Sequence, residues 1–227
     1  GHQAQVAGQD RLLRPDHRRR RHGLAEGQAE GPKWDTNAIT PGTAFMGKLR
    51  KALEKQAGSG WTISSSDEPG EGEHKIMEKI RQMPFPAAST HVVYGMDADL
   101  VVLSLLTQNT VVAENKQPLS MWLFREEQES PGFEWFSIDG LRDSISSTLP
   151  IRDYCFAMSF LGNDFLPSAL GLKMREDGHE ILMDLVAYLC HSKTPLLDEQ
   201  DVPSVRGLAA LFKSLGSSEE RRIRDFV

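Results

Sequence analysis

Residues 91–100 read HVVYGMDADL, and this stretch decides the fold that we expect. Residues 91–94 form a continuous apolar run that closes at Gly95, which is typical of a buried strand. Asp97 lies at the end of that strand, and Asp99 begins a helix that we expect to reach Leu105. In open α/β sheets, ligands bind outside the carboxyl ends of the strands, where both carboxylates would lie. An Asp at a helix start is also an ordinary N-cap, so Asp99 keeps that alternative role.

Strands and helices alternate around this stretch and then give way to helices. This order predicts an α/β fold with a mainly parallel sheet and flanking helices, followed by an α-helical extension. We expect Trp122, Phe133 and Trp135 to be core residues of their strands. The expected strands are 61–64, 91–94, 110–113, 121–124 and 133–136. The expected helices are one that starts near 40–43 and ends before 58, and then 71–81, 99–105, 141–147, 152–161, 180–191, 205–215 and 219–226.

The charge of the chain is divided unevenly. The 227 residues have a net charge of −6, but residues 1–33 carry seven Lys and Arg against four Asp and Glu, so the remainder is more acidic still. We expect 1–33 to be a poorly ordered basic tail; the arginine run 18–21 also suits a nucleic-acid arm or a localisation signal. An acidic body argues against broad nucleic-acid binding through surface charge. It is compatible with carboxylates that hold cations, which in turn bind phosphate.

The cysteine pattern and the lengths of the apolar runs indicate the cellular compartment that we expect. Cys155 and Cys190 form no C-x-x-C pair, so we expect neither a zinc site nor a disulfide framework. No apolar run approaches the roughly 18–20 residues that span a bilayer, so no membrane partner is expected. We therefore expect an intracellular protein, in the nucleus or the cytoplasm. The sequence indicates no particular protein partner.

A second acidic motif, GEGEHKIM, covers residues 70–77. On a helix that begins here, Glu73 precedes Ile76, Met77 and Ile80 at helical spacing, which places it on the core-facing stripe. A carboxylate in that position is costly unless it is paired or bound to a metal ion. Glu71 lies in the first turn, where the helix dipole favours negative charge. Simple charge capping is therefore the alternative role for both glutamates.

The third acidic motif is FLGNDFLP, residues 160–167. Gly162 ends a helix, and we expect Asp164 to lie in a tight turn between apolar anchors. Asn and Asp after Gly are also common turn residues, so this motif has a purely structural alternative.

The five acids together indicate more than each motif alone. Carboxylates without His or Cys partners suit hard cations such as Mg²⁺ or Mn²⁺. Two such ions about 4 Å apart can activate a water and stabilise the leaving oxygen of a phosphodiester. The candidate catalytic and metal-binding residues are therefore Glu71, Glu73, Asp97, Asp99 and Asp164.

Several motifs resemble, in order, those of the Xrn family of 5′→3′ exoribonucleases. They are WDTNAITPGT at 34–43, PGEGEHKI at 69–76, YGMDADL at 94–100, FREE at 124–127 and LGNDFLP at 161–167. The resemblance covers residue 34 to about residue 227. It implies a core related to flap endonucleases and PIN-like nucleases that degrades 5′-monophosphorylated RNA processively to mononucleotides. It also implies that the five acids hold two Mg²⁺ or Mn²⁺ ions.

The resemblance divides the chain into three parts. We expect no family match in 1–33, a nuclease core at 34–168 that lacks its first strands, and a helical extension at 169–227. The family has further catalytic Asp residues on a first strand and a basic helix that binds the 5′-phosphate, and we find neither in 1–33. We therefore expect the chain to be incomplete, and weakly active or inactive by itself.

Two alternatives to an exoribonuclease stay open. One is a non-catalytic RNA-binding or interaction module derived from that nuclease. The other is a structure-specific DNA nuclease of the flap-endonuclease type, which has the same acidic-site chemistry. It is the weaker of the two, because we find no helix-hairpin-helix element for duplex DNA between 164 and 227.

Overall fold

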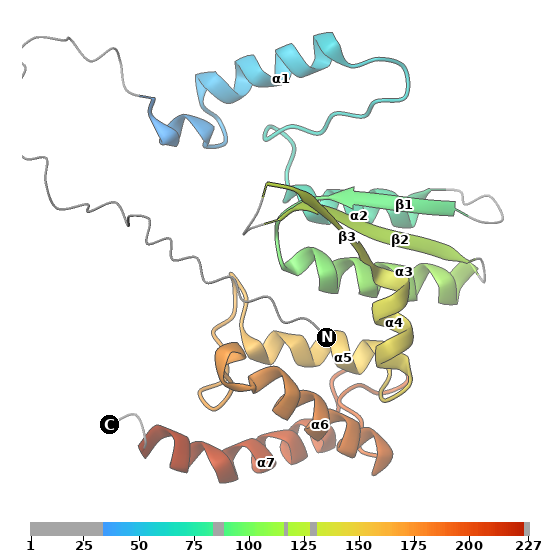
Figure 1. Ribbon diagram of the computed structural model, residues 1–227, viewed down its shortest axis with the longest axis vertical. Helices are drawn as coiled ribbons and strands as arrows, with labels where there is room; N and C mark the ends of the chain where they lie inside the picture. Colours follow the sequence, from blue (N-terminus) through green and yellow to red (C-terminus); the bar gives the residue numbers. More distant parts are fainter. Residues whose placement is uncertain (1–33, 84–88, 116–117, 128–130, 225–227) are drawn as a thin grey trace, which may run out of the picture. The chain divides into compact units, whose positions relative to one another are not determined.

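The computed structural model describes residues 34–83, 89–115, 118–127 and 131–224 (Figure 1). The expectations for 1–33 lie outside the described residues. Contacts within the chain divide it into two compact units, Gly1–Asp67 and Glu68–Val227. All five candidate acids belong to the second unit.

The described part of the first unit consists of two helices. A 3₁₀ helix, η1, covers Thr36–Ile39, and α1 covers Ala44–Gln56. Thr43 caps α1 by accepting the backbone N–H of Met46 at 3.3 Å, which confirms the predicted helix start. The strand expected at 61–64 is wrong, because these residues form no regular structure. Strand propensity alone does not form a strand, since its backbone groups need a neighbouring strand to pair with.

The second unit contains a three-stranded sheet in the order β1-β2-β3. The strands are β1 Ser89–Tyr94, β2 Leu119–Glu126 and β3 Phe133–Ser137. β1 and β2 run parallel and are joined through α3, Asp99–Asn115, whereas β2 and β3 run antiparallel. The expected mainly parallel sheet is therefore corrected to a small mixed one. Only residues 127–132 separate β2 from β3, and so short a connection permits only an antiparallel pair.

The helix α3 is longer than predicted. Residues 110–113, expected as a strand, continue the helix to Asn115. Leu105 and Val111 are fully buried along it, because α3 packs against β2 and also against α2 and α5. A helix that is covered on several sides is apolar nearly all round, and a short apolar run within it looks the same as a buried strand.

Helices make up most of the rest of the second unit. α7 replaces the two helices expected at 205–215 and 219–226, because the Gly216 between them costs a helix only about 1 kcal/mol. α5 packs on α3, α6 on α5 and α7 on α6, as the stacked layers of Figure 1 show. No described helix is both long and apolar enough to cross a bilayer. The α-helices are α2 Gly72–Gln82, α4 Ile138–Ser146, α5 Ile151–Met158, α6 Gly178–His191 and α7 Val205–Arg224, and the 3₁₀ helices are η2 Ser159–Leu161 and η3 Met174–Glu176.

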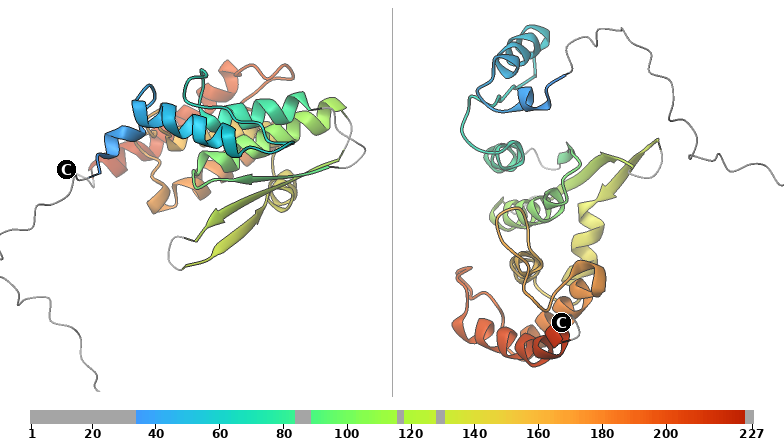
Figure 2. Two further views of the ribbon diagram at one scale, coloured as in Figure 1. Left: turned by 90° about the horizontal axis from the view of Figure 1, so that it is seen from above. Right: turned by 90° about the vertical axis from the view of Figure 1, so that its left-hand side faces the viewer.

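The two faces of the sheet have different surroundings. Leu119, Met121 and Leu123 of β2 are buried, and Figure 2 shows α3 lying along one side of the sheet. The alternate side chains point to the opposite face, where Phe133 is 56% exposed and Trp135 60% exposed. The expectation that both are core residues is therefore wrong. Period-two alternation shows that a strand has two faces, but not which one a helix will cover.

Candidate active site

Glu71 and Glu73 are presented by the start of α2. Glu71 is the N-cap residue and makes no side-chain cap hydrogen bond, and Glu73 lies in the first turn. Met77 and Ile80 are buried on the same helix, whereas Ile76 is 40% exposed. The predicted stripe is therefore confirmed for two of its three apolar members. Glu73, half-buried above Met77, lies at the rim of the core.

The segment between β1 and α3 separates the roles of its two aspartates. Asp97 Oδ1 accepts the backbone N–H of Asp99 at 3.2 Å, so Asp97 supplies a local turn contact. The Asp99 carboxylate accepts no hydrogen bond from any residue that the structure describes. A Cβ at Gly95 would lie 2.4 Å from Leu100 Cδ1, so a larger residue at this position would require the Leu100 side chain to move. Leu100 of α3 thus packs closely against the end of β1.

Asp164 lies in the loop that follows η2. Asn163 Oδ1 accepts the N–H groups of Phe165 and Leu166 at 2.9 and 2.8 Å, and Asn163 N donates to Leu166 O at 2.9 Å. Asn163 therefore supplies the turn contacts, and the Asp164 side chain is not used for them. The expected apolar anchoring is wrong for Phe165, whose side chain is 68% exposed.

The charges of the five acids act on one another. Burial raises the pKa of Glu73, and the negative charges of Asp97, Glu71 and Asp99 raise it further. Burial likewise raises the pKa of Asp99, with added contributions from Asp97, Asp164 and Glu71. Each shift is partly opposed by His74, whose Nδ1 lies 3.7 Å from Glu71 Oε2. The charges of the five predicted acids are thus linked through Glu73 and Asp99, and we call these five acids the negative cluster.

A cavity of about 390 Å³ opens beside this cluster. Glu71, Glu73, Asp99 and His74 line it, together with apolar side chains that include Phe165 and Met174. In the described residues, no three acidic, His or Cys side chains are grouped closely enough to hold a metal ion. The chemistry of the donors nevertheless fits a hard divalent cation, because all are carboxylates whose mutual repulsion such a cation would relieve.

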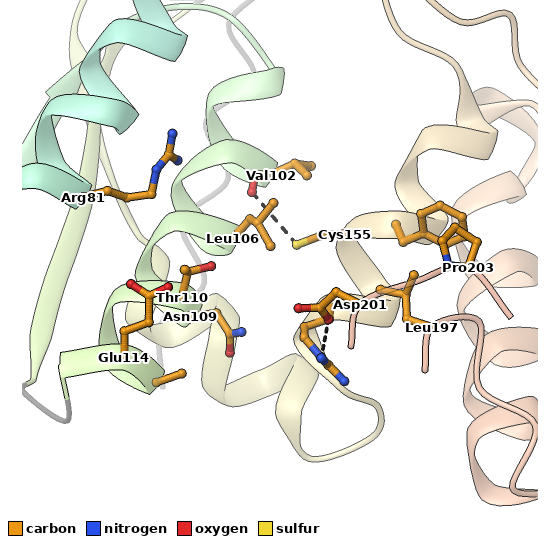
Figure 3. Close-up of a pocket in the computed structure, with 13 residues that line it drawn as sticks. Arg81, Val102, Leu106, Asn109, Thr110, Glu114, Cys155, Leu197, Asp201 and Pro203 are labelled. Carbon is orange, nitrogen blue, oxygen red and sulfur yellow. Dashed lines mark hydrogen bonds and ion pairs between the residues drawn. The ribbon is translucent and has the colours of Figure 1, made fainter. Parts of the chain in front are cut away.

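A second, larger cavity of about 930 Å³ lies farther along α3, toward its C-terminal end (Figure 3). It shares Val102 and Cys155 with the first cavity, and its remaining lining comes from α2, α3, α5 and residues 197–203. Arg152 and Asp201 form an ion pair in its wall. None of the five acids lines it, so it is separate from the cluster.

The two cysteines are free thiols. Burial raises the pKa of Cys155 to about 12. Burial, followed by the charge of Asp153, raises that of Cys190 to about 11. Neither thiol is therefore activated as a nucleophile at neutral pH.

Comparison with known proteins places the chain in a family. A family model described as the N-terminus of the XRN 5′-3′ exonucleases matches residues 3–113, and four of the five acids lie within that range. The match begins inside 1–33, where we expected no family resemblance.

Proteins named 5′-3′ exoribonuclease 2 are similar over most of the chain. The one from Saccharomyces cerevisiae is 33% identical over 235 residues, which are 82% of this chain and 23% of that protein. The one from Eremothecium gossypii is 32% identical over 239 residues, 82% of this chain and 25% of that protein. The chain thus spans about a quarter of the length of the curated relatives it matches.

Proposed function

This chain belongs to the XRN 5′-3′ exonuclease family, and we propose that it carries the metal-binding part of a 5′→3′ exoribonuclease active site. The observation that supports this is the negative cluster. The five acids come from three separate segments, yet their charges are linked through Glu73 and Asp99. Three of them, Glu71, Glu73 and Asp99, line one cavity. Such an arrangement reduces stability unless a cation is bound there.

The proposed substrate is single-stranded RNA with a 5′-monophosphate, released as mononucleotides. Two Mg²⁺ or Mn²⁺ ions would supply activation of the attacking water and stabilisation of the departing 3′ oxygen. The protein's own residues would hold the ligating oxygens in place. Asp97 accepts the N–H of Asp99, and the Asn163 turn leaves the Asp164 side chain unused for turn contacts, so that its charge acts on Asp99.

We expect the 227-residue chain to turn RNA over weakly or not at all by itself. It spans about a quarter of the relatives' length, and the family resemblance implies further metal-binding acids besides these five. Missing metal ligands reduce both cation affinity and transition-state stabilisation.

A second candidate function is cation-dependent RNA binding without catalysis. One observation favours it: within the described residues, the acids are not drawn together into a metal-binding group. The carboxylates would then contribute to RNA binding through cations without assembling a reactive centre.

Digestion of 5′-monophosphate RNA with Mn²⁺ tests the proposal, with 5′-hydroxyl RNA and a flap DNA in parallel. We expect slow loss of the 5′-monophosphate RNA alone, abolished by Asp97→Ala. Asp143→Ala is the matched control, because Asp143 is exposed and its only described partner is Arg142. Mn²⁺-dependent binding without any product would support the second candidate, and preferential cleavage of the flap DNA would contradict both. Processive turnover by the chain alone would contradict the expected weak activity.

A further inference from the structure

The cavity beside the acids has a lining of two chemical kinds. Carboxylates from α2 and α3 form one part, and the apolar side chains of Met158, Leu161, Phe165 and Met174 form the other. At about 390 Å³ it lies at the small end of the range for ligand sites, roughly 300–1,000 Å³. This size and this combination of charged and apolar lining suit a single nucleotide, which has an anionic phosphate and a flat, largely apolar base.

Phe165 is held in place by its main chain while its ring is exposed. Its N–H donates to Asn163 Oδ1 at 2.9 Å, and the loop is closed by the Ala169 N–H, which donates to Phe160 O at 2.8 Å. Gly162 permits this path with a φ of 87°, and a Cβ there would lie 2.8 Å from Ser168 N. The phenyl ring is thus positioned beside the acids without contributing to the core.

We propose that Phe165 stacks on the base of the nucleotide whose phosphodiester lies at the acidic cluster. This inference rests on the proposed function and identifies the part of the site that holds the base. Stacking is tolerant of sequence because every base has a π-face. The neighbouring thioethers of Met158 and Met174 adapt to bases of different size. The subsite would therefore accept all four bases, as a processive exonuclease requires.

The test measures binding rather than turnover, so it does not depend on how active the chain is. A short 5′-monophosphate RNA carries 2-aminopurine as its first base, and Ca²⁺ replaces the catalytic cation. We expect the fluorescence of the base to change on binding to the unaltered chain. Phe165→Ala should lose that change and weaken binding roughly tenfold, whereas Phe165→Trp should retain both.

Tyr188→Ala is the matched control, because Tyr188 is an aromatic residue of α6 with the same exposure, 67% against 68% for Phe165. A second RNA, abasic at its first position, separates stacking from a merely structural role. The unaltered chain should bind it about as weakly as Phe165→Ala binds the intact RNA, and Phe165→Ala should not distinguish the two RNAs.

The outcomes separate this inference from the proposed function. If Asp97→Ala abolishes cation-dependent RNA binding while Phe165→Ala leaves affinity and fluorescence unchanged, the stacking role is wrong and the proposed function stands. If removing the base weakens binding to both chains by the same factor, the stacking role is also wrong. If the unaltered chain shows no Ca²⁺-dependent RNA binding, the proposed function fails and this inference fails with it.

Discussion

Two groups of carboxylates in the same unit have opposite surroundings. Asp153 is only 2% exposed, and its Oδ1 accepts the N–H groups of Leu196 and Leu197 at 2.7 and 3.3 Å. Asp139 accepts hydrogen bonds from Gln108 and from Ser120, the latter at 2.6 Å. We call Asp139 and Asp153 the structural acids, because each joins segments that are far apart in the chain.

We call the five acids of the negative cluster the site acids, and among the described residues none of them accepts a hydrogen bond from a distant segment of the chain. In the part of the chain that the structure describes, Glu73, Asp99 and Asp164 accept no hydrogen bond and form no ion pair. Burial, followed by the negative charges of neighbouring acids, raises the pKa of Glu73 and of Asp99. The structural acids thus have donors, whereas Glu73, Asp99 and Asp164 have none among the described residues, which agrees with the proposed binding of a cation.

The largest expected effect is that of Asp153→Ala. It leaves two buried backbone N–H groups without an acceptor, so we expect a loss of about 2–4 kcal/mol in the free energy of unfolding. Urea denaturation followed by circular dichroism measures it. Asp143→Ala, at an exposed position, should change the same quantity by less than about 0.5 kcal/mol. If the two variants were equally stable, Asp153 would not be a structural acid.

Gly162→Ala should have an intermediate effect on the loop that carries Asp164. With a φ of 87° and a Cβ 2.8 Å from Ser168 N, the substitution should cost roughly 1–3 kcal/mol. Thermal unfolding measures the loss, and Mn²⁺ titration should show weakened binding because Asp164 is displaced. Gly216→Ala in α7 is the control; nothing lies within 4 Å of its Cβ, so it should stabilise the chain by up to about 1 kcal/mol. Unchanged Mn²⁺ affinity in Gly162→Ala would remove Asp164 from the site acids.

The smallest expected effect has the opposite sign, because Glu73→Gln should stabilise the chain in cation-free buffer. Because the pKa of Glu73 is raised, the Glu73 carboxyl stays protonated to a higher pH in the folded state than in the unfolded state. This part of the stability is therefore lost as pH rises from the ordinary carboxyl pKa of 4.5 through the raised value. The variant should show a flatter decline in melting temperature over that range.

Added Mg²⁺ should raise the melting temperature of the unaltered chain more than that of Glu73→Gln, since the variant has lost one ligand. Glu199→Gln, at an exposed loop position, is the control and should match the unaltered chain in both measurements. A lower melting temperature for Glu73→Gln in EDTA would show that Glu73 stabilises the fold, and would move it to the structural acids.

The sequence by itself determined the elements whose signals are local. The apolar run before Asp97, the Thr43 cap and the spacing of Met77 and Ile80 behind Glu73 predicted β1, α1 and α2 correctly, because capping and periodicity act within a few residues. The proposal that the five acids form a site also came from the sequence, since carboxylates without His or Cys partners indicate binding of a hard cation.

Only the tertiary structure decided which elements pair and which faces are covered. Residues 61–64 found no strand to pair with, 110–113 were enclosed as part of α3, and Trp135 lies on a sheet face that α3 does not cover. Nothing near Asp153 in the sequence indicates that its donors come from 196–197. Likewise, it was the Asn163 turn that freed Asp164 and exposed Phe165. These outcomes depend on partners distant in the chain or on which local contact prevails, and residue type alone does not specify them.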